Sequence, residues 1–157
     1  MYQPTAEAPA RPSETDVHQL INHTLHSTDT TTDDDVVDLL GAPLRTTVRV
    51  VPNTYAAGQI DTVRTLYYPA LQAQLYIRSD DTRSFLIQMR LHGSFYSTPD
   101  GLQVDMERSA VQQQMGQPHR VEDEVWVYEN VSQGAADLRL AWHDKRVRSI
   151  TYVFYFS

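Results

Sequence analysis

Two short stretches of this 157-residue chain determine the predicted fold: DVVDLLGAP at residues 35–43 and AVQQQMGQP at residues 110–118. Each stretch spaces its apolar residues as a helix does and then ends in Gly-x-Pro. That ending stops a helix, because glycine reverses the backbone and proline cannot continue the hydrogen bonding. The stretches are 75 residues apart, with a valine, the glycine and the proline at matching positions. This self-similarity predicts an internal duplication.

The segments around the first stretch predict the rest of that half. Residues 13–26 are expected to form a helix, since Ser13 can cap its start and apolar residues recur at helical spacing. Residues 33–40 are expected to form a shorter helix with three aspartates in the favourable first turn. After Pro43 the apolar period changes to two. Strands are therefore expected at residues 46–51, 61–68, 71–77 and 84–91.

The pattern of residues 84–91 predicts a strand of an antiparallel sheet with one buried and one exposed face. Its alternation gives two sets of side chains on opposite faces. The apolar set is Phe85, Ile87, Met89 and Leu91, and the polar set is Gln88, Arg90 and His92.

The second half has strand-like segments in the same order as the first. Residues 65–68, 75–77 and 83–91 correspond to residues 125–128, 138–140 and 146–154. The sequence therefore predicts an α+β protein of two tandem repeats, each a short helix or helix pair followed by a three- to four-stranded antiparallel meander. The expected boundaries are a flexible leader at 1–12, a first repeat at 13–92 and a second at 93–157. The two meanders can form separate sheets or one continuous sheet, and the sequence leaves both open.

Composition excludes several classes of protein. No segment approaches the about 18–20 consecutive apolar residues of a transmembrane helix, so no membrane span is expected. The absence of cysteine excludes disulfides, thiolate zinc sites and cysteine nucleophiles. Eight acidic residues and one arginine give residues 1–40 a net charge of −7, whereas residues 41–157 are neutral. Because a nucleic-acid backbone needs clustered basic residues, no nucleic-acid partner is expected.

Several segments resemble a known family. FYSTPDGL at residues 95–102, VQQQMGQP at 111–118, VWVY at 125–128 and KRVRSI at 145–150 are similar to the SmpA/OmlA (BamE-like) domain. The related β-lactamase inhibitor protein-like fold is a tandem of such units, so the resemblance extends over residues 13–157. It implies a non-catalytic protein of the periplasm or cell envelope, lipid-tethered or secreted, that binds another protein.

The strands of the second meander are apolar on both faces, although a sheet covered by a helix on one side needs only one apolar face. Aromatic residues and arginine dominate the energetics of protein interfaces. We therefore expect one sheet face to bind a partner protein. Its residues are Leu66, Tyr68, Tyr76, Trp126, Tyr128 and Arg139. The alternative is that this face is the helix-packed core, because a shift of one residue in the alternation exchanges every side chain between faces.

Other chemistry has little support in the sequence. His23 and His26 have ligand spacing on the first helix, but no carboxylate completes the set, and no metal or cofactor is expected. Because no nucleophile elbow, phosphate-binding glycine loop or dinucleotide fingerprint occurs, an enzyme is not expected. Two alternatives to protein binding stay open: a small-ligand carrier using a cavity between sheet and helices, and an enzyme with unrecognised chemistry.

Overall fold

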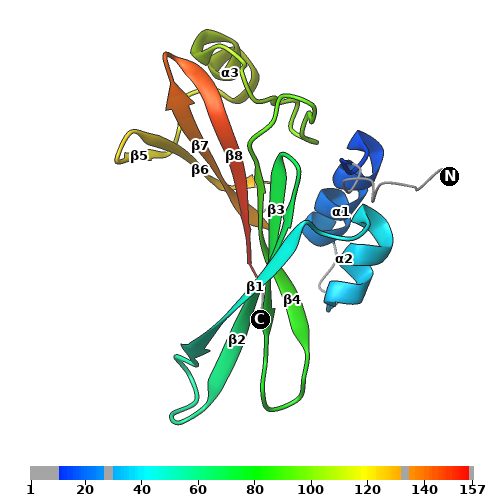
Figure 1. Ribbon diagram of the computed structural model, residues 1–157. Helices are drawn as coiled ribbons and strands as arrows, with labels where there is room; N and C mark the ends of the chain where they lie inside the picture. The colour runs from blue at the N-terminus through cyan, green and yellow to red at the C-terminus, as the bar shows by residue number, and fades with distance from the viewer. Residues whose placement is uncertain (1–10, 27–29, 132–134, 156–157) are drawn as a thin grey trace, which may run out of the picture.

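The structure is a computed structural model that describes residues 11–26, 30–131 and 135–155. Within these ranges three short helices accompany one eight-stranded antiparallel sheet (Figure 1). The helices are α1 (Glu14–His26), α2 (Asp33–Leu40) and α3 (Arg108–Met115). The strands are β1 (Arg45–Pro52), β2 (Ile60–Tyr68), β3 (Leu71–Ile77), β4 (Ser84–Leu91), β5 (Arg120–Glu122), β6 (Val125–Asn130), β7 (Ala136–His143) and β8 (Arg146–Phe154).

Local signals in the sequence set the ends of the helices, as expected. Thr32 caps α2 with a capping box, because its hydroxyl accepts from the Asp35 amide and the Asp35 carboxylate accepts from the Thr32 amide. Gly41 ends α2 with a φ of 87°, and Gly116 ends α3 with a φ of 76°. Both values lie in the left-handed region that glycine adopts at little cost. The prediction that Gly-x-Pro stops these helices is confirmed.

The sheet has the strand order β1-β2-β3-β4-β8-β7-β6-β5. Two meanders, β1–β4 and β5–β8, therefore meet where β4 pairs with β8. The pairs at this junction are Gln88↔Val153, Met89↔Tyr152, Arg90↔Thr151 and Leu91↔Ile150. Of the two arrangements left open for the meanders, the continuous sheet is the one observed.

The predicted fold class, an α+β protein of two tandem helix-plus-meander repeats, is wrong. The protein is a mostly-β fold built on a single sheet, and its three helices are short. The physical reason is the β4–β8 pairing, which joins the two apolar faces into one. A single cluster of buried residues consequently extends from Val17 in α1 to Phe154 in β8.

The core lies between the helices and one face of the sheet (Figure 1). Helix α1 contributes Val17, Leu20 and Ile21, which are almost fully buried. Burying a Leu or Ile side chain is worth roughly 1.5–3 kcal/mol, so this face supplies most of the helix's attachment. Helix α2 is also tied to β2 by an ion pair between Asp33 and Arg64.

Helix α3 and the segment that precedes it extend the core past the β7–β8 turn. Val111 of α3 is fully buried. The Arg108 guanidinium lies 5.4 Å from the Trp126 ring centroid and 4.7 Å from that of Trp142. The Arg108 amide donates to the carbonyl of Lys145 in the β7–β8 turn.

A bulge between β3 and β4 changes which face one aromatic residue occupies. Gln74 pairs with Gln88 while Leu75 pairs with Leu86, so that Ile87 is the extra residue. Phe85 therefore lies across from Tyr76, on the face opposite Met89 and Leu91. The expectation that Phe85 shares a face with those residues is wrong for this reason.

Residues 1–10 of the expected leader lie outside the described residues. The last two leader residues make contacts. The Arg11 guanidinium lies 3.6 Å from the Phe95 ring centroid, and the Tyr96 hydroxyl donates to the Pro12 carbonyl at 2.8 Å. The longest helix within the described ranges, α1, has 13 residues, and none of the helices there is long and apolar enough to span a membrane.

Because the two meanders share one core, we expect a destabilising substitution in the first meander to destabilise the second as well. Leu75→Ala removes a fully buried side chain of β3 and should cost about 2–5 kcal/mol. Both tryptophans, Trp126 and Trp142, lie in the second meander. We expect the urea midpoint from tryptophan fluorescence to fall as far as the midpoint from far-ultraviolet circular dichroism. Val50→Ala, at a site that is 71% exposed, is the matched control. A fluorescence midpoint that stays unchanged in Leu75→Ala would contradict a shared core.

Candidate functional site

Four of the six residues expected to bind a partner lie in the core. They are Leu66, Tyr68, Trp126 and Tyr128, each with at most 9% of its surface exposed. The Tyr68 hydroxyl donates to the Gly41 carbonyl and the Tyr128 hydroxyl to the Gly116 carbonyl, each at 2.8 Å. The expectation that these four side chains lie on an exposed face is wrong. The helices cover the face that carries them, which is the one-residue shift in alternation considered above.

The other two expected residues, Tyr76 and Arg139, lie on the opposite face. Tyr76 pairs with Phe85, and Arg139 pairs with Thr151. Directly paired residues share a face and successive residues alternate, so both side chains point away from α1 and α2. Both side chains are half-buried. They lie apart, because the pairing that runs from Arg139 across β8 and β4 reaches β3 at Gln72, four residues from Tyr76.

The face opposite α1 and α2 is called the open face here. One row of directly paired residues crosses all eight of its strands. From β1 to β5 this row is Arg45, Tyr67, Gln72, Arg90, Thr151, Arg139, Val127 and Arg120. Among the described residues, no helix lies against this face, because α1 and α2 lie on the other side (Figure 1) and α3 packs into the same core through Val111. The sheet thus presents a surface rich in arginine.

A hollow of about 340 Å³ lies in the open face, on strands β4, β6, β7 and β8. Its polar lining consists of Gln88, Arg90, Arg139, Arg148, Ser149 and Thr151, and its apolar lining consists of Val125, Ala141 and Val153. We call it the arginine hollow. It takes residues from both meanders, so it exists only because β4 pairs with β8.

One of the three arginines in this hollow is already paired. Arg139 Nη2 lies 2.7 Å from the Glu122 carboxylate, whose other oxygen lies 2.6 Å from Arg120 Nε. Arg120 also contacts Glu129. The Arg139 and Arg120 guanidinium groups lower the pKa of Glu122 below its usual value. The edge of the hollow at β5 and β6 is therefore electrically balanced.

The other two arginines are unbalanced. Within the described part of the chain, neither Arg90 nor Arg148 makes an ion pair, and Arg90 Nε is buried without a hydrogen-bond partner. The pKa of His92 is lowered, first by burial and then by the positive charge of Arg90. The hollow therefore has a net positive charge and an unsatisfied donor.

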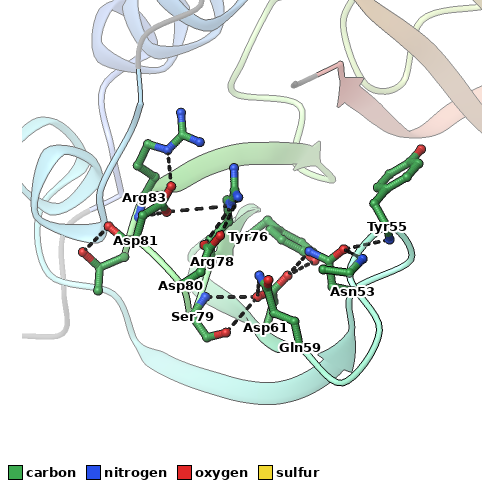
Figure 2. A network of polar contacts seen from close by, with 12 residues as sticks. Asn53, Tyr55, Gln59, Asp61, Tyr76, Arg78, Ser79, Asp80, Asp81 and Arg83 are labelled. Atoms are coloured by element: carbon green, nitrogen blue, oxygen red, sulfur yellow. Dashed lines mark hydrogen bonds and ion pairs between the residues drawn. The ribbon is translucent and has the colours of Figure 1, made fainter.

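A polar network organises the far end of the open face, around Asp61 of β2 (Figure 2). Asp61 is fully buried, and its carboxylate accepts from four residues of two loops and of β3. The donors are Asn53 Nδ2, Gln59 Nε2, the Tyr76 hydroxyl and both the amide and hydroxyl of Ser79. The network ties the β1–β2 loop to the β3–β4 turn and fixes the Tyr76 ring.

This network fixes the protonation states of Asp61 and Tyr76. The donors lower the pKa of Asp61 well below its usual range, with Gln59 and Tyr76 contributing most. Burial and then the hydrogen bond to Asp61 raise the pKa of Tyr76 to about 12. At neutral pH the carboxylate is charged and the phenol is neutral, so neither exchanges a proton readily. The arrangement is suited to holding loops together.

A second hollow, of about 450 Å³, lies beside this network. Its walls include Tyr55, Tyr76, Arg78 and Phe85. Tyr55 is 99% exposed, and its amide donates to the side chain of Asn53. This hollow adds aromatic surface at the end of the open face.

Sequence reasoning placed Arg90 on a polar strand face but did not connect it with Arg139 or Arg148. The alternation of residues 84–91 gave the signal for Arg90, whereas the grouping depends on strand register. Nothing in the sequence signals Asp61, because its hydrogen-bond donors come from separate loops. His23 and His26 are exposed on α1. Among the described residues, no group of three or more His, Asp or Glu side chains is arranged to hold a metal ion.

Comparison with known proteins gives little further information. No protein-family model matches the chain, and no curated protein matches it. Among solved structures, the chain is similar to the uncharacterized protein yfeY from Escherichia coli, with a TM-score of 0.46 and 13% sequence identity. The similarity covers 81% of this chain and 90% of that chain.

The Asp61 network predicts a pH-dependent effect of Asp61→Asn. The folded state lowers the pKa of Asp61, so its stabilising contribution is present above the unfolded-state pKa of about 3.9 and is lost as the pH falls below it. We expect Asp61→Asn to lower the thermal midpoint at pH 7 by about 5 °C or more, because the negative charge is lost and an NH2 group replaces one of the two acceptor oxygens. The two neighbours that donate to that oxygen then lose their acceptor. The difference from the wild type should shrink steadily as the pH falls below about 3.9.

The control for this measurement is Asp38→Asn, at an exposed position of α2. It should leave the thermal midpoint close to that of the wild type at every pH. A difference for Asp61→Asn that does not change with pH would refute the role given to the charged carboxylate.

Proposed function

We propose that this chain is a non-catalytic protein-binding or assembly module of the bacterial cell envelope, and that its partner protein docks on the open face of the sheet. The observation that carries the proposal is the division of the sheet into two unlike faces. One face is fully occupied by the core beneath the helices. The other crosses eight strands and keeps half-buried arginine, glutamine and aromatic side chains at its surface.

The composition of the open face supports protein binding. Tyr and Arg are enriched at the centres of protein interfaces, where they combine a large contact area with directional hydrogen bonds. Tyr67, Tyr76 and four arginines of the row across the strands supply both. A strand-based surface is also rigid, so binding freezes little backbone motion.

Two features favour binding over catalysis. The buried carboxylate of Asp61 has its oxygens occupied by donors, and the phenol of Tyr76 stays protonated at neutral pH. The arginine hollow contains no carboxylate, histidine or apparent nucleophile pair to act on a substrate. Placement in the envelope rests on the resemblance of residues 95–102, 111–118 and 145–150 to the SmpA/OmlA domain. The net charge of −7 disfavours a nucleic-acid partner.

A carrier with a cavity between the sheet and the helices fits less well. The hollows described above open on the far side of the sheet from the helices. A further hollow lies between α1 and α2, where Gln19, His23, Asp35 and Asp38 line it. No observation favours an enzyme with unrecognised chemistry.

Photocrosslinking from matched glutamine positions tests the proposal. Gln72 and Gln74 lie on the open face, whereas Gln19 of α1 and Gln113 of α3 are exposed on the helices. Each glutamine is replaced in turn by a photoreactive amino acid, and the protein is irradiated in a bacterial envelope extract. We expect a discrete cross-linked protein from positions 72 and 74 and none from positions 19 and 113. Equal cross-linking at all four positions, or cross-linking from the helices alone, would contradict the proposed docking face.

A further inference from the structure

We propose that the arginine hollow binds the carboxylates of an acidic segment of the partner protein, an inference that rests on the proposed function of the open face. The hollow supplies what such a segment requires: convergent cations, unused hydrogen-bond donors and apolar walls for the rest of its side chains. The residues that supply them lie on β4, β6, β7 and β8.

The register brings the cations together. Arg90, Thr151 and Arg139 are directly paired on three successive strands. Strands lie about 4.7–4.9 Å apart, so the Cα atoms of the two arginines are about 10 Å apart with a hydroxyl between them. A carboxylate above Thr151 is within reach of both guanidinium groups. Arg148, which is exposed, reaches the same hollow from the bulged part of β8.

The lining of the hollow has an excess of positive charge. Three arginines line it, and no acidic side chain does. Glu122 neutralises Arg139 from outside, while Arg90 and Arg148 have no ion pair within the described residues. Arg90 Nε is moreover buried without an acceptor. Arg90 as a whole is half-buried, so a carboxylate from a partner can pair with the accessible part of its side chain and supply the missing charge.

The surroundings favour a peptide over a phosphate or a nucleic acid. Arginine forks bind phosphate as well as carboxylate, but many phosphate sites also use free backbone amides at helix N-termini or in tight turns. The hollow is instead built on paired strands, and its walls include Val125, Ala141 and Val153. The planar fork of arginine matches a carboxylate, and the valines offer contact for neighbouring apolar side chains. The negative charge of the whole chain repels polyanions, so an acidic ligand must be held by local contacts.

Glu122 acts in this scheme as an internal competitor. Its carboxylate already occupies one fork of Arg139 at 2.7 Å, and it lies on the exposed edge strand β5. A partner carboxylate would share or displace it. Removing its charge therefore should strengthen binding, an effect that a merely structural role of Glu122 would not produce.

Fluorescence anisotropy with two labelled peptides tests the inference. In one peptide glutamate alternates with serine, and in the other glutamine replaces glutamate. We expect the glutamate peptide to bind saturably and at least about tenfold more tightly than the glutamine peptide. Arg90→Ala and Arg148→Ala should each weaken it about tenfold, and Glu122→Gln should tighten it. Arg49→Ala, which removes an exposed charge from the distant strand β1, should change the affinity less than about twofold.

Several outcomes would overturn the inference. They are no binding of the glutamate peptide, equal losses in Arg49→Ala and Arg148→Ala, and displacement of the peptide by inorganic phosphate at a concentration below that of the free glutamate peptide. Self-association in analytical ultracentrifugation that Arg148→Ala abolishes would identify a second copy as the occupant and would also overturn it. Because Arg148 is exposed, that variant keeps the test valid if Arg90→Ala fails to fold. If the peptides fail while positions 72 and 74 still cross-link a partner, the inference fails and the proposed function stands.

Discussion

Pairing of β4 with β8 is the constraint on which the rest of the structure depends. Four residue pairs make the junction, and they fall alternately on the two faces of the sheet. Met89↔Tyr152 and Leu91↔Ile150 join the apolar faces of the two meanders into one core. The two intervening pairs join the open faces and place Arg90 beside Thr151. Core and candidate site are therefore set by the same few hydrogen-bonded residues.

The two sides of the sheet differ in charge as well as in cover. Helices α1 and α2 carry six of the acidic residues of the N-terminal segment. They are Glu14, Asp16, Asp33, Asp34, Asp35 and Asp38. In the arginine hollow of the open face, two arginines, Arg90 and Arg148, make no ion pair within the described ranges. The acidic residues of these helices therefore lie on the opposite side of the sheet from Arg90 and Arg148.

Local structure could be predicted closely from the sequence, because its signals are local. Capping at Thr32, the stops at Gly41 and Gly116 and the change of apolar period after Pro43 gave helix and strand positions that agree with the structure to within a few residues. The similarity of the two halves, however, led to a description as two repeats. The single sheet depends on pairing between residues some 60 positions apart, for which the sequence contains no direct signal.

The faces of the strands could not be assigned for a related reason. Alternation separates Trp126 and Tyr128 from Val125 and Val127 but does not say which set the helices cover. The hydroxyls of Tyr68 and Tyr128 resolve this, because each bonds a carbonyl at the end of a helix and so allows a tyrosine in the core. Tyr76 and Arg139 were expected on the same face as the other four residues, but they lie half-buried on the open face. That Arg90 and Thr151 lie beside Arg139 could be determined only from the strand register.

Native-state amide hydrogen exchange tests the junction most directly. If one sheet and one core hold the molecule together, the amides that bridge Gln88–Leu91 and Ile150–Val153 open only with global unfolding. We predict that their exchange free energies equal the free energy of unfolding from urea titration and match those of the best-protected amides in β3 and β7. Exchange at the junction through a low-energy local opening, while β3 and β7 stay protected, would show two separable units and would contradict a continuous open face.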